Sequence, residues 1–187
     1  MKHSTGKSDK IIKAAIDQFS KKGYDRATID DIANKSRVSK GIVFFYFKRK
    51  EKLVEKVALL SVPHDVIQEV NNHHYNDAKD LLMEFSMRFL EKYKERNMRN
   101  LLLMTMVSKD RFPVINRALE AMCFQEMDKM FSTAENILGH KIKVPIRRAL
   151  FGSLLCYLIW WDKNEVDPQK YVSDLINGIL KAVYEDQ

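Results

Sequence analysis

Cysteine, glycine and proline are scarce in this 187-residue sequence, and long apolar runs are missing. Two cysteines, Cys123 and Cys156, are too few and too far apart for a disulfide framework, so a reducing, cytoplasmic setting is expected. Six glycines and four prolines are too few for the frequent turns of a β-sandwich or barrel, which favours helices. The longest apolar run, Leu154–Trp161, is far shorter than the about 20 residues of a membrane-spanning helix, so no membrane partner is expected.

Positive charge is concentrated in the first third of the chain. The whole sequence is 45% hydrophobic and 30% charged, as an ordinary globular protein is, and its net charge is +7. Residues 1–62 hold 15 Lys and Arg against 7 Asp and Glu, whereas residues 63–187 hold 17 against 18. This asymmetry indicates either a polyanionic partner or a basic face that is only solvated.

Apolar spacing predicts an all-α fold. A first helix is expected over residues 8–22 and a fourth over residues 50–62, ended by Pro63, with Thr28 and Ser39 as cap residues for two short helices between them. Residues 64–76 are polar and weakly patterned. Longer helices are expected over residues 77–95, 98–109, 113–138, 144–163 and 168–185. The last is the clearest, because it follows Asp167 and Pro168, an N-cap and a first-turn proline.

The two short helices, joined by a four- or five-residue turn, have the arrangement of a helix-turn-helix. If Val43 faces the core, helical geometry turns the opposite face of the second helix outward. The outward residues are then Gly41, Ile42, Phe44 and Phe45. Exposed aromatic rings beside lysines favour a partner that is flat, methylated and anionic, which describes the DNA major groove. Packing of one of the two rings, Phe44 rather than Phe45, back against the first helix is an open alternative.

Three motifs in this region resemble the N-terminal domain of tetracycline-repressor (TetR)-type transcriptional regulators. They are Thr28-Ile-Asp-Asp-Ile-Ala33, Val38-Ser39-Lys40-Gly41 and Tyr46-Phe47-Lys48-x-Lys50-Glu51-x-Leu53. The resemblance implies a homodimer with about nine helices per subunit, a helix-turn-helix DNA-binding domain at residues 1–50, and a larger effector-binding and dimerisation domain at residues 51–187. It implies neither enzymatic activity nor a cofactor.

The resemblance also assigns roles to individual residues. Lys40, Gly41 and Ile42 would approach base edges, where Ile42 could meet a thymine methyl. The candidates for phosphate contacts are Thr28, Tyr46, Lys48 and Lys50. The full expected DNA-binding set is Thr28, Arg37, Ser39, Lys40, Gly41, Ile42, Phe44, Phe45, Tyr46, Lys48 and Lys50.

The sequence departs from the family pattern at three of these positions. Arg37 stands in the turn where glycine is usual, Ile42 replaces a small hydroxyl residue, and Phe44 replaces tyrosine. A left-handed Arg37 would cost on the order of 1 kcal/mol, but its guanidinium could also contact a phosphate, and both interpretations are open. Since the usual hydroxyl groups are missing, the operator sequence does not transfer from the family.

Eight of the nine methionines lie between residues 83 and 130, in helices that the resemblance places around an effector pocket. Methionine lines cavities for apolar ligands, but it also fills irregular cores, so both interpretations are open. The residues expected to line a pocket for an apolar or amphipathic effector are Phe85, Phe89, Met104, Met127, Phe131 and Trp160.

The expected helix over residues 144–163 is apolar nearly all round between Ala149 and Trp161, more than one core-facing stripe requires. Together with the helix over residues 168–185 it is expected to form the homodimer interface. A helix lying on a membrane surface is the competing interpretation.

The sequence therefore predicts a sequence-specific transcriptional regulator, a repressor that a small-molecule effector releases from a double-stranded DNA operator. No metal site is expected, because His73 and His74 are adjacent and the other three histidines are scattered. The alternatives are an all-helical enzyme whose basic end binds an anionic substrate, and a DNA-binding protein without effector control.

Overall fold

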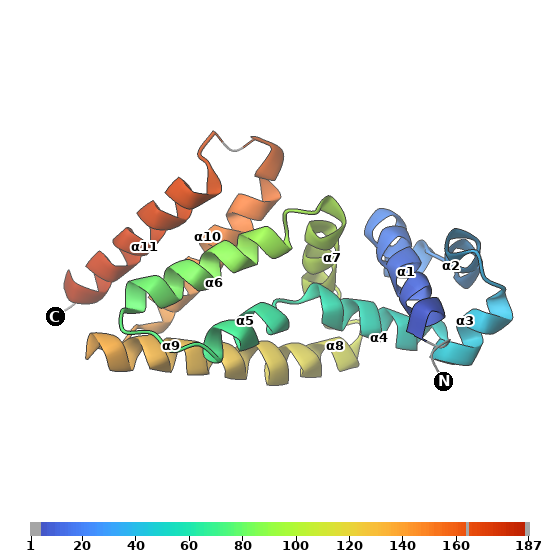
Figure 1. Cartoon of the computed structure of the whole chain (residues 1–187), viewed down its shortest axis with the longest axis horizontal. Coiled ribbons are helices and arrows are strands. Elements are labelled where there is room, and N and C mark those ends of the chain that lie inside the picture. The colour runs from blue at the N-terminus through green and yellow to red at the C-terminus, as the bar shows by residue number, and fades with distance from the viewer. Residues whose placement is uncertain (1–4, 164, 186–187) are drawn as a thin grey trace. The chain divides into compact units, whose positions relative to one another are not determined.

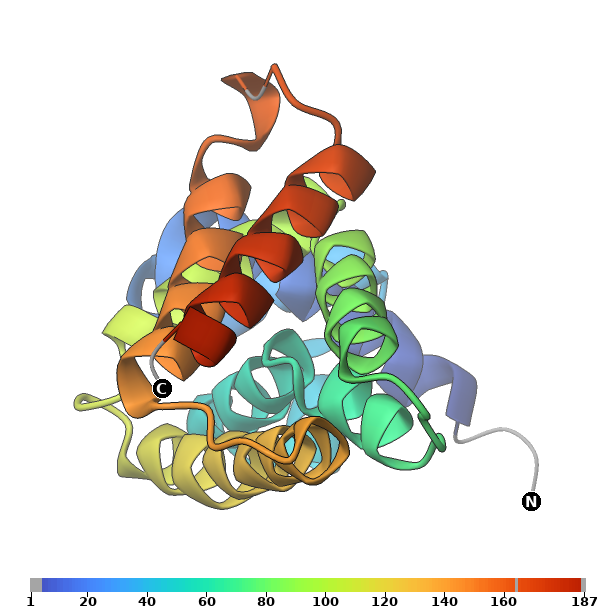
Figure 2. The ribbon, with the colours of Figure 1, turned by 90° about the vertical axis from the view of Figure 1, so that its left-hand side faces the viewer.

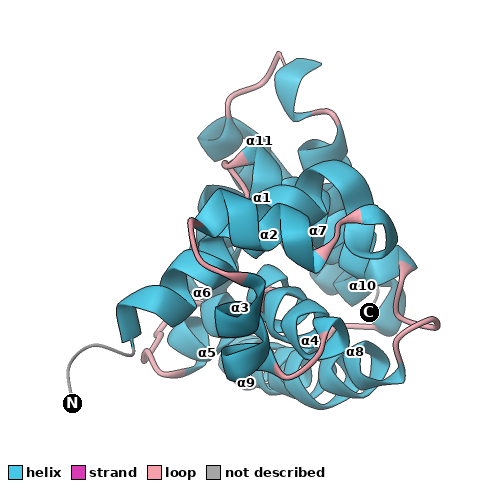
Figure 3. Ribbon diagram, turned by 90° about the vertical axis from the view of Figure 1, so that its right-hand side faces the viewer, coloured by secondary structure: helices cyan, strands magenta, loops and turns pink. Residues whose placement is uncertain are grey.

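The computed structural model describes residues 5–163 and 165–185, without the side chains of residues 5, 118 and 121–123. Every regular element in this described part is helical, as Figure 3 shows in cyan, and the predicted all-α class is confirmed. The side chains that the structure does not describe include that of Cys123 and that of Met122, one of the eight methionines counted above. The chain forms two compact units. We call residues up to Val62 with Glu95–Leu119 the head unit, and Pro63–Lys94 with the residues from Glu120 onward the body unit.

The head unit is built around the first helix. Its helices, labelled in Figure 1, are α1 (Thr5–Arg26), α2 (Ile29–Ser36), α3 (Lys40–Phe47), α4 (Lys50–Ser61), α7 (Arg96–Val107) and α8 (Pro113–Ala118). The apolar stripe of α1, which includes Ile11, Ala15 and Phe19, is fully buried against α2, α4 and α7. The regular first part of α1 ends where the sequence predicted, because Gly23 (φ 85°, ψ 162°) has a non-helical backbone, and the few residues up to Arg26 follow beyond this break.

The cap residues that the sequence predicted set the start of α2 and α3. Thr28 Oγ1 accepts a hydrogen bond from the Asp31 amide at 3.1 Å, and the Asp31 carboxylate accepts one from the Thr28 amide at 2.9 Å, which forms a capping box. Ser39 Oγ accepts a hydrogen bond from the Ile42 amide at 3.4 Å. Because both starts are fixed, the outward residues of α3 are fixed as well.

Helix α7 packs inside the head unit, against α1 and α4. Its buried Thr105 Oγ1 lies 2.7 Å from the Tyr24 hydroxyl and 2.8 Å from Ser61 Oγ, which joins the three helices by hydrogen bonds. Arg111, just beyond α7, pairs with Asp25 at 2.7 Å. The compact unit that contains the helix-turn-helix is therefore larger than the 1–50 segment expected for DNA binding.

The body unit contains the remaining long helices. They are α5 (His64–Asn71), α6 (Ala78–Lys92), α9 (Gln125–Leu138), α10 (Val144–Ile159) and α11 (Pro168–Glu185). Figure 2 shows α10 and α11 side by side, and α11 also packs along α6. Asp167 caps α11 as predicted, because its Oδ1 accepts hydrogen bonds from the amides of Gln169 and Lys170 at 3.0 and 3.1 Å.

One helix was not predicted, and one prediction about a helix was wrong. The segment 64–76 holds helix α5, whose Val66, Ile67 and Val70 are buried on one side. The expected continuous helix over residues 113–138 is divided into α8 and α9 by a π-helical turn, Leu119–Phe124. These differences explain why the described part holds eleven α-helices where about nine were expected.

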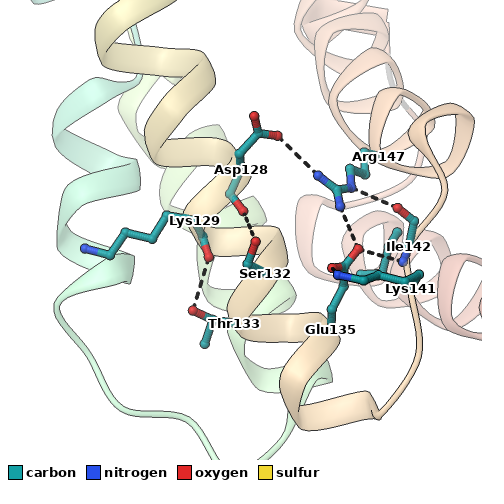
Figure 4. A network of polar contacts seen from close by, with 8 residues as sticks. All are labelled: Asp128, Lys129, Ser132, Thr133, Glu135, Lys141, Ile142 and Arg147. Atoms are coloured by element: carbon teal, nitrogen blue, oxygen red, sulfur yellow. Dashed lines mark hydrogen bonds and ion pairs between the residues drawn. The ribbon is translucent and has the colours of Figure 1, made fainter.

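A polar network fixes the loop between α9 and α10 (Figure 4). The buried Glu135 carboxylate accepts hydrogen bonds from Arg147 Nη2 at 2.6 Å, Lys141 Nζ at 2.7 Å and the Ile142 amide at 2.9 Å. Arg147 also contacts Asp128 at 3.2 Å. Burial alone would raise the pKa of Glu135, but these hydrogen bonds outweigh burial and hold the pKa below its ordinary value. The network thus orients the N-terminal end of α10.

Candidate nucleic-acid interface

Helix α3 has a single buried residue and turns aromatic rings to solvent. Val43 is 0% exposed, whereas Phe44 and Phe45 are 39% and 70% exposed. Gly41 is exposed too, and Ser39 Oγ, at 3.9 Å, is the nearest described side-chain atom to the position that a Cβ would take there. The helix is therefore rotated as its spacing predicted, and Phe44 is not part of the head core.

Two half-buried residues border this outward face. Ile42 packs at the edge of the head core and leaves part of its side chain in solvent. The Tyr46 ring stands edge-on to Phe45, with ring centroids 5.3 Å apart and an interplanar angle of 90°. The face is thus mainly apolar, and Tyr46 supplies its one hydroxyl group.

Lysines flank the face at both ends. Lys40 forms an ion pair with Asp30 at 2.9 Å, but both side chains are more than half exposed, and such surface pairs contribute only about 0–1 kcal/mol. Lys50 Nζ donates a hydrogen bond to the Asp25 carbonyl at 2.7 Å. Both ammonium groups are therefore at the surface, where a stronger anion could bind them.

Two further cations flank α3 in the chain: Arg37 ends α2, three residues before α3 begins, and Lys48 follows α3 directly. Both are exposed, and neither forms an ion pair with a residue that the structure describes. Both have a φ of 57°, which is uncommon for residues other than glycine. Arg37 is in the left-handed conformation that its turn position suggested, so it combines backbone strain with a guanidinium that has no ion pair among the described residues.

The structure also brings together basic residues that sequence reasoning did not single out. Lys7, Lys10 and Lys13 of α1 line a groove with Lys35 and Arg37. The recurrence of lysine at every third position in α1 was the available signal. It places these side chains on adjacent turns of one helix.

Three of the expected pocket residues lie in the core of the body unit. Phe85, Phe89 and Phe131 are at most 2% exposed. The Phe85 and Phe89 rings are 6.0 Å apart, and the Phe89 ring is 4.8 Å from Tyr93. These rings are therefore neighbours in a close-packed cluster.

The other expected pocket residues are placed elsewhere. Met104 packs against the core of the head unit, so it does not share a unit with the phenylalanines. Met127 is half-buried on α9. Trp160 is 54% exposed and lines a surface cavity of about 280 Å³ with Cys156 and Tyr171.

Metal sites and membrane-spanning helices are two further features that bear on function. In residues 5–163 and 165–185, no group of three or more His, Cys, Asp or Glu side chains is placed to hold a metal ion. Over the same described ranges, no helix combines the length and the apolar character needed to cross a membrane.

Comparison with known proteins agrees with the geometry of the head unit. Residues 11–57 match the family model described as bacterial regulatory proteins, tetR family. YvdT of Bacillus subtilis, an uncharacterized HTH-type transcriptional regulator, is 31% identical over 98 residues, which cover 50% of each protein. IcaR of Staphylococcus epidermidis, the negative transcriptional regulator of the biofilm operon icaADBC, is 33% identical over 88 residues, 47% of this chain and 48% of IcaR. The match thus spans about half the length of these curated relatives.

The likeness of the fold extends along the whole chain. The structure of the transcriptional regulator FadR from Bacillus subtilis, in complex with stearoyl-CoA, is similar with a TM-score of 0.69 at 19% identity. The superposition covers 94% of this chain and 97% of FadR. The matched relatives are described as transcriptional regulators and not as enzymes. Residues 11–57 thus match the tetR family of bacterial regulatory proteins, and the chain as a whole shares the fold of a solved transcriptional regulator.

Proposed function

We propose that this protein is a transcriptional repressor that binds a near-palindromic DNA operator as a homodimer and is released by a small apolar or amphipathic effector. The observation that carries the proposal is the outward face of α3. It exposes Phe44 and Phe45 to solvent between cations that stand before and after the helix. Exposed aromatic rings flanked by cations favour a partner with apolar and anionic groups side by side, as in the major groove.

The composition of this face favours recognition of bases through apolar contacts. Gly41, Ile42, Phe44 and Phe45 have no hydrogen-bonding side-chain atoms, so they cannot make the bidentate contacts that arginine makes with guanine. They can pack against thymine methyl groups, and Gly41 lets the backbone approach closely. We therefore expect the central contacted positions of each half-site to be rich in A·T pairs.

The outer surfaces of α10 and α11 support a two-fold homodimer. On α10, the exposed residues include a stripe at helical spacing, Ala149, Gly152, Cys156 and Ile159. On α11, Gly178 and Ala182 are exposed four residues apart. Such a surface suits an isologous contact, in which the same patch of each subunit meets its copy. Two copies of α3 would then enter successive major grooves about 34–36 Å apart.

The body unit is where we place the effector. Its buried aromatic cluster, with Phe85, Phe89 and Tyr93, is largely apolar, Phe131 is buried on α9 of the same unit, and FadR of similar fold was solved with stearoyl-CoA. An effector that enters this cluster must displace packed side chains, so it would bind one conformation of the body much better than the other. To shift the protein from 99% in the DNA-binding conformation to 1%, the effector must bind the other conformation more strongly by about 5.5 kcal/mol.

A binding experiment tests the proposal. A duplex is selected from random DNA with the full chain, and fluorescence anisotropy then compares it with a shuffled duplex at about 50–200 mM salt. We expect a specific preference of at least about 1000-fold and a steep loss of affinity with salt. Equal affinity for both duplexes contradicts a sequence-specific regulator, and binding without salt dependence contradicts the assigned phosphate contacts.

A matched pair of variants localises the contact. Lys48→Ala should weaken binding to every duplex and reduce the slope of log affinity against log salt by about one. Lys129→Ala, an exposed lysine on α9 of the body unit, should change neither quantity. Equal effects of the two substitutions would mean that Lys48 acts only through net charge.

A further inference from the structure

The head unit has a second cationic surface, a groove between α1 and the turn that joins α2 to α3. The groove has a volume of about 450 Å³. Its lining residues are Lys7, Lys10, Lys13, Ala14, Lys35, Ser36, Arg37 and Val38. Five of these eight residues are cationic and none is acidic, so the groove favours an anionic ligand with several charges.

Most of this charge is not neutralised by ion pairs with the residues that the structure describes. Apart from Lys35, the cations of the groove form no ion pair with any residue in the described part of the chain. Lys35 lies 3.4 Å from Asp17, but that carboxylate is closer to Lys21, at 2.6 Å. Gathering like charges without partners is unfavourable in the free protein, and an anion that binds there removes the repulsion.

The position of the groove in the head unit indicates which anion it binds. Arg37 and Val38 belong both to the groove and to the turn immediately before α3. In a helix-turn-helix complex, the N-terminal residues of the recognition helix reach the bases, so the segment before them lies beside the phosphates that border the major groove. A row of lysines along α1 can extend this contact to further phosphates.

We propose that the groove formed by Lys7, Lys10, Lys13, Lys35 and Arg37 binds phosphates of the DNA duplex outside the base pairs that α3 contacts, and so lengthens the footprint of each subunit. The inference rests on the proposed DNA-binding function. It adds three α1 lysines to the interface and predicts that affinity depends on DNA beyond the recognised bases.

The test uses the full chain, its selected operator, and duplexes shortened one base pair at a time from both ends. The variant is the triple substitution Lys7→Gln, Lys10→Gln and Lys13→Gln, because glutamine keeps length and helix propensity but removes charge. The control carries the same loss of charge in the body unit, at Lys79, Lys94 and Lys129. Circular dichroism and thermal unfolding verify that both variants fold like the unmodified chain.

On the long duplex, we expect the α1 variant to bind at least tenfold more weakly and the salt slope to fall by about 0.9 for each phosphate that the variant no longer neutralises. On the shortest duplex that still holds the recognised bases, unmodified chain and α1 variant should bind equally. An α1 variant that matches the body-unit control on every duplex overturns the inference and leaves the proposed function intact. An equal loss of affinity on long and short duplexes also overturns it, whereas absence of operator binding by the unmodified chain overturns the proposed function itself.

Discussion

Val43 and Phe45, two residues apart on α3, point in opposite directions, since Val43 is 0% exposed and Phe45 is 70% exposed. Stability and DNA binding should therefore separate between them. Phe45→Ala is expected to change the free energy of unfolding by less than about 0.5 kcal/mol, as a surface substitution does, but to weaken operator binding at least tenfold. Val43→Ala should lower the free energy of unfolding by about 2 kcal/mol, because it leaves a cavity in the head core. Urea denaturation and anisotropy titration measure the two effects, and a destabilised Phe45→Ala that binds normally would contradict the assignment.

Arg37 offers a substitution with opposite effects on folding and binding. Glycine adopts its φ of 57° without strain, which relieves about 1–2 kcal/mol, while the greater freedom of glycine in the unfolded chain offsets about 0.5–1 kcal/mol. Arg37→Gly should therefore leave the free energy of unfolding unchanged or raise it by up to about 1.5 kcal/mol. It should also weaken DNA binding and reduce the salt slope by about one. Arg37→Lys, the control that keeps the charge, should retain the slope. If Arg37→Gly binds DNA as well as the unmodified chain, the guanidinium makes no phosphate contact.

Thymine methyl groups should contribute to operator affinity. Replacing each half-site thymine in turn by deoxyuridine removes only the methyl, so a contact with Ile42, Phe44 or Phe45 would appear as a loss of about 1 kcal/mol at one or two positions. Anisotropy titration of the substituted duplexes measures the loss. In Phe45→Ala, the deoxyuridine effect at the position that Phe45 contacts should vanish. Uniform affinity across all deoxyuridine duplexes would show that α3 reads the bases by other means.

The Glu135 network predicts a specific pH dependence of folding. Its pKa in the folded state lies below the ordinary value of 4.5, so the ionised group stabilises the fold above that pH, and this contribution is lost as the pH falls through the folded pKa. Glu135→Gln should lower the free energy of unfolding by about 2–3 kcal/mol at pH 7, and the difference from the unmodified chain should shrink below pH 4.5. Denaturation across pH measures this, with the exposed Glu91→Gln as a control that changes little. A difference that grows on acidification would contradict the direction of the shift.

The helix-turn-helix could be predicted from sequence because local rules define it. Thr28 and Ser39 start their helices through side-chain caps, and the position of Val43 fixes the outward direction of Phe45 by helical geometry alone. None of these features depends on contacts between distant segments. The strength of this local pattern also explains why the resemblance to the TetR family could be recognised in so short a region.

Features that depend on distant segments could not be predicted. Thr105 joins Tyr24 and Ser61 across 81 and 44 residues of sequence, and nothing local to α7 shows that it packs in the head unit. The basic groove likewise needs α1 to lie beside the α2–α3 turn. Helix α5 was missed for another reason, since its apolar stripe is only three residues within a polar segment.

The most direct test of the central claim, that the outward face of α3 lies in the major groove, is photo-crosslinking to operator DNA that carries 5-iodouracil in place of thymine. The iodine atom occupies the position of the thymine methyl in the major groove, and aromatic side chains next to it crosslink on irradiation. Mass spectrometry of the digested complex should identify Phe44 or Phe45 as the linked residue. The iodouracil is placed at operator positions that determine affinity. If it crosslinks there only to peptides outside residues 37–50, the claim is contradicted.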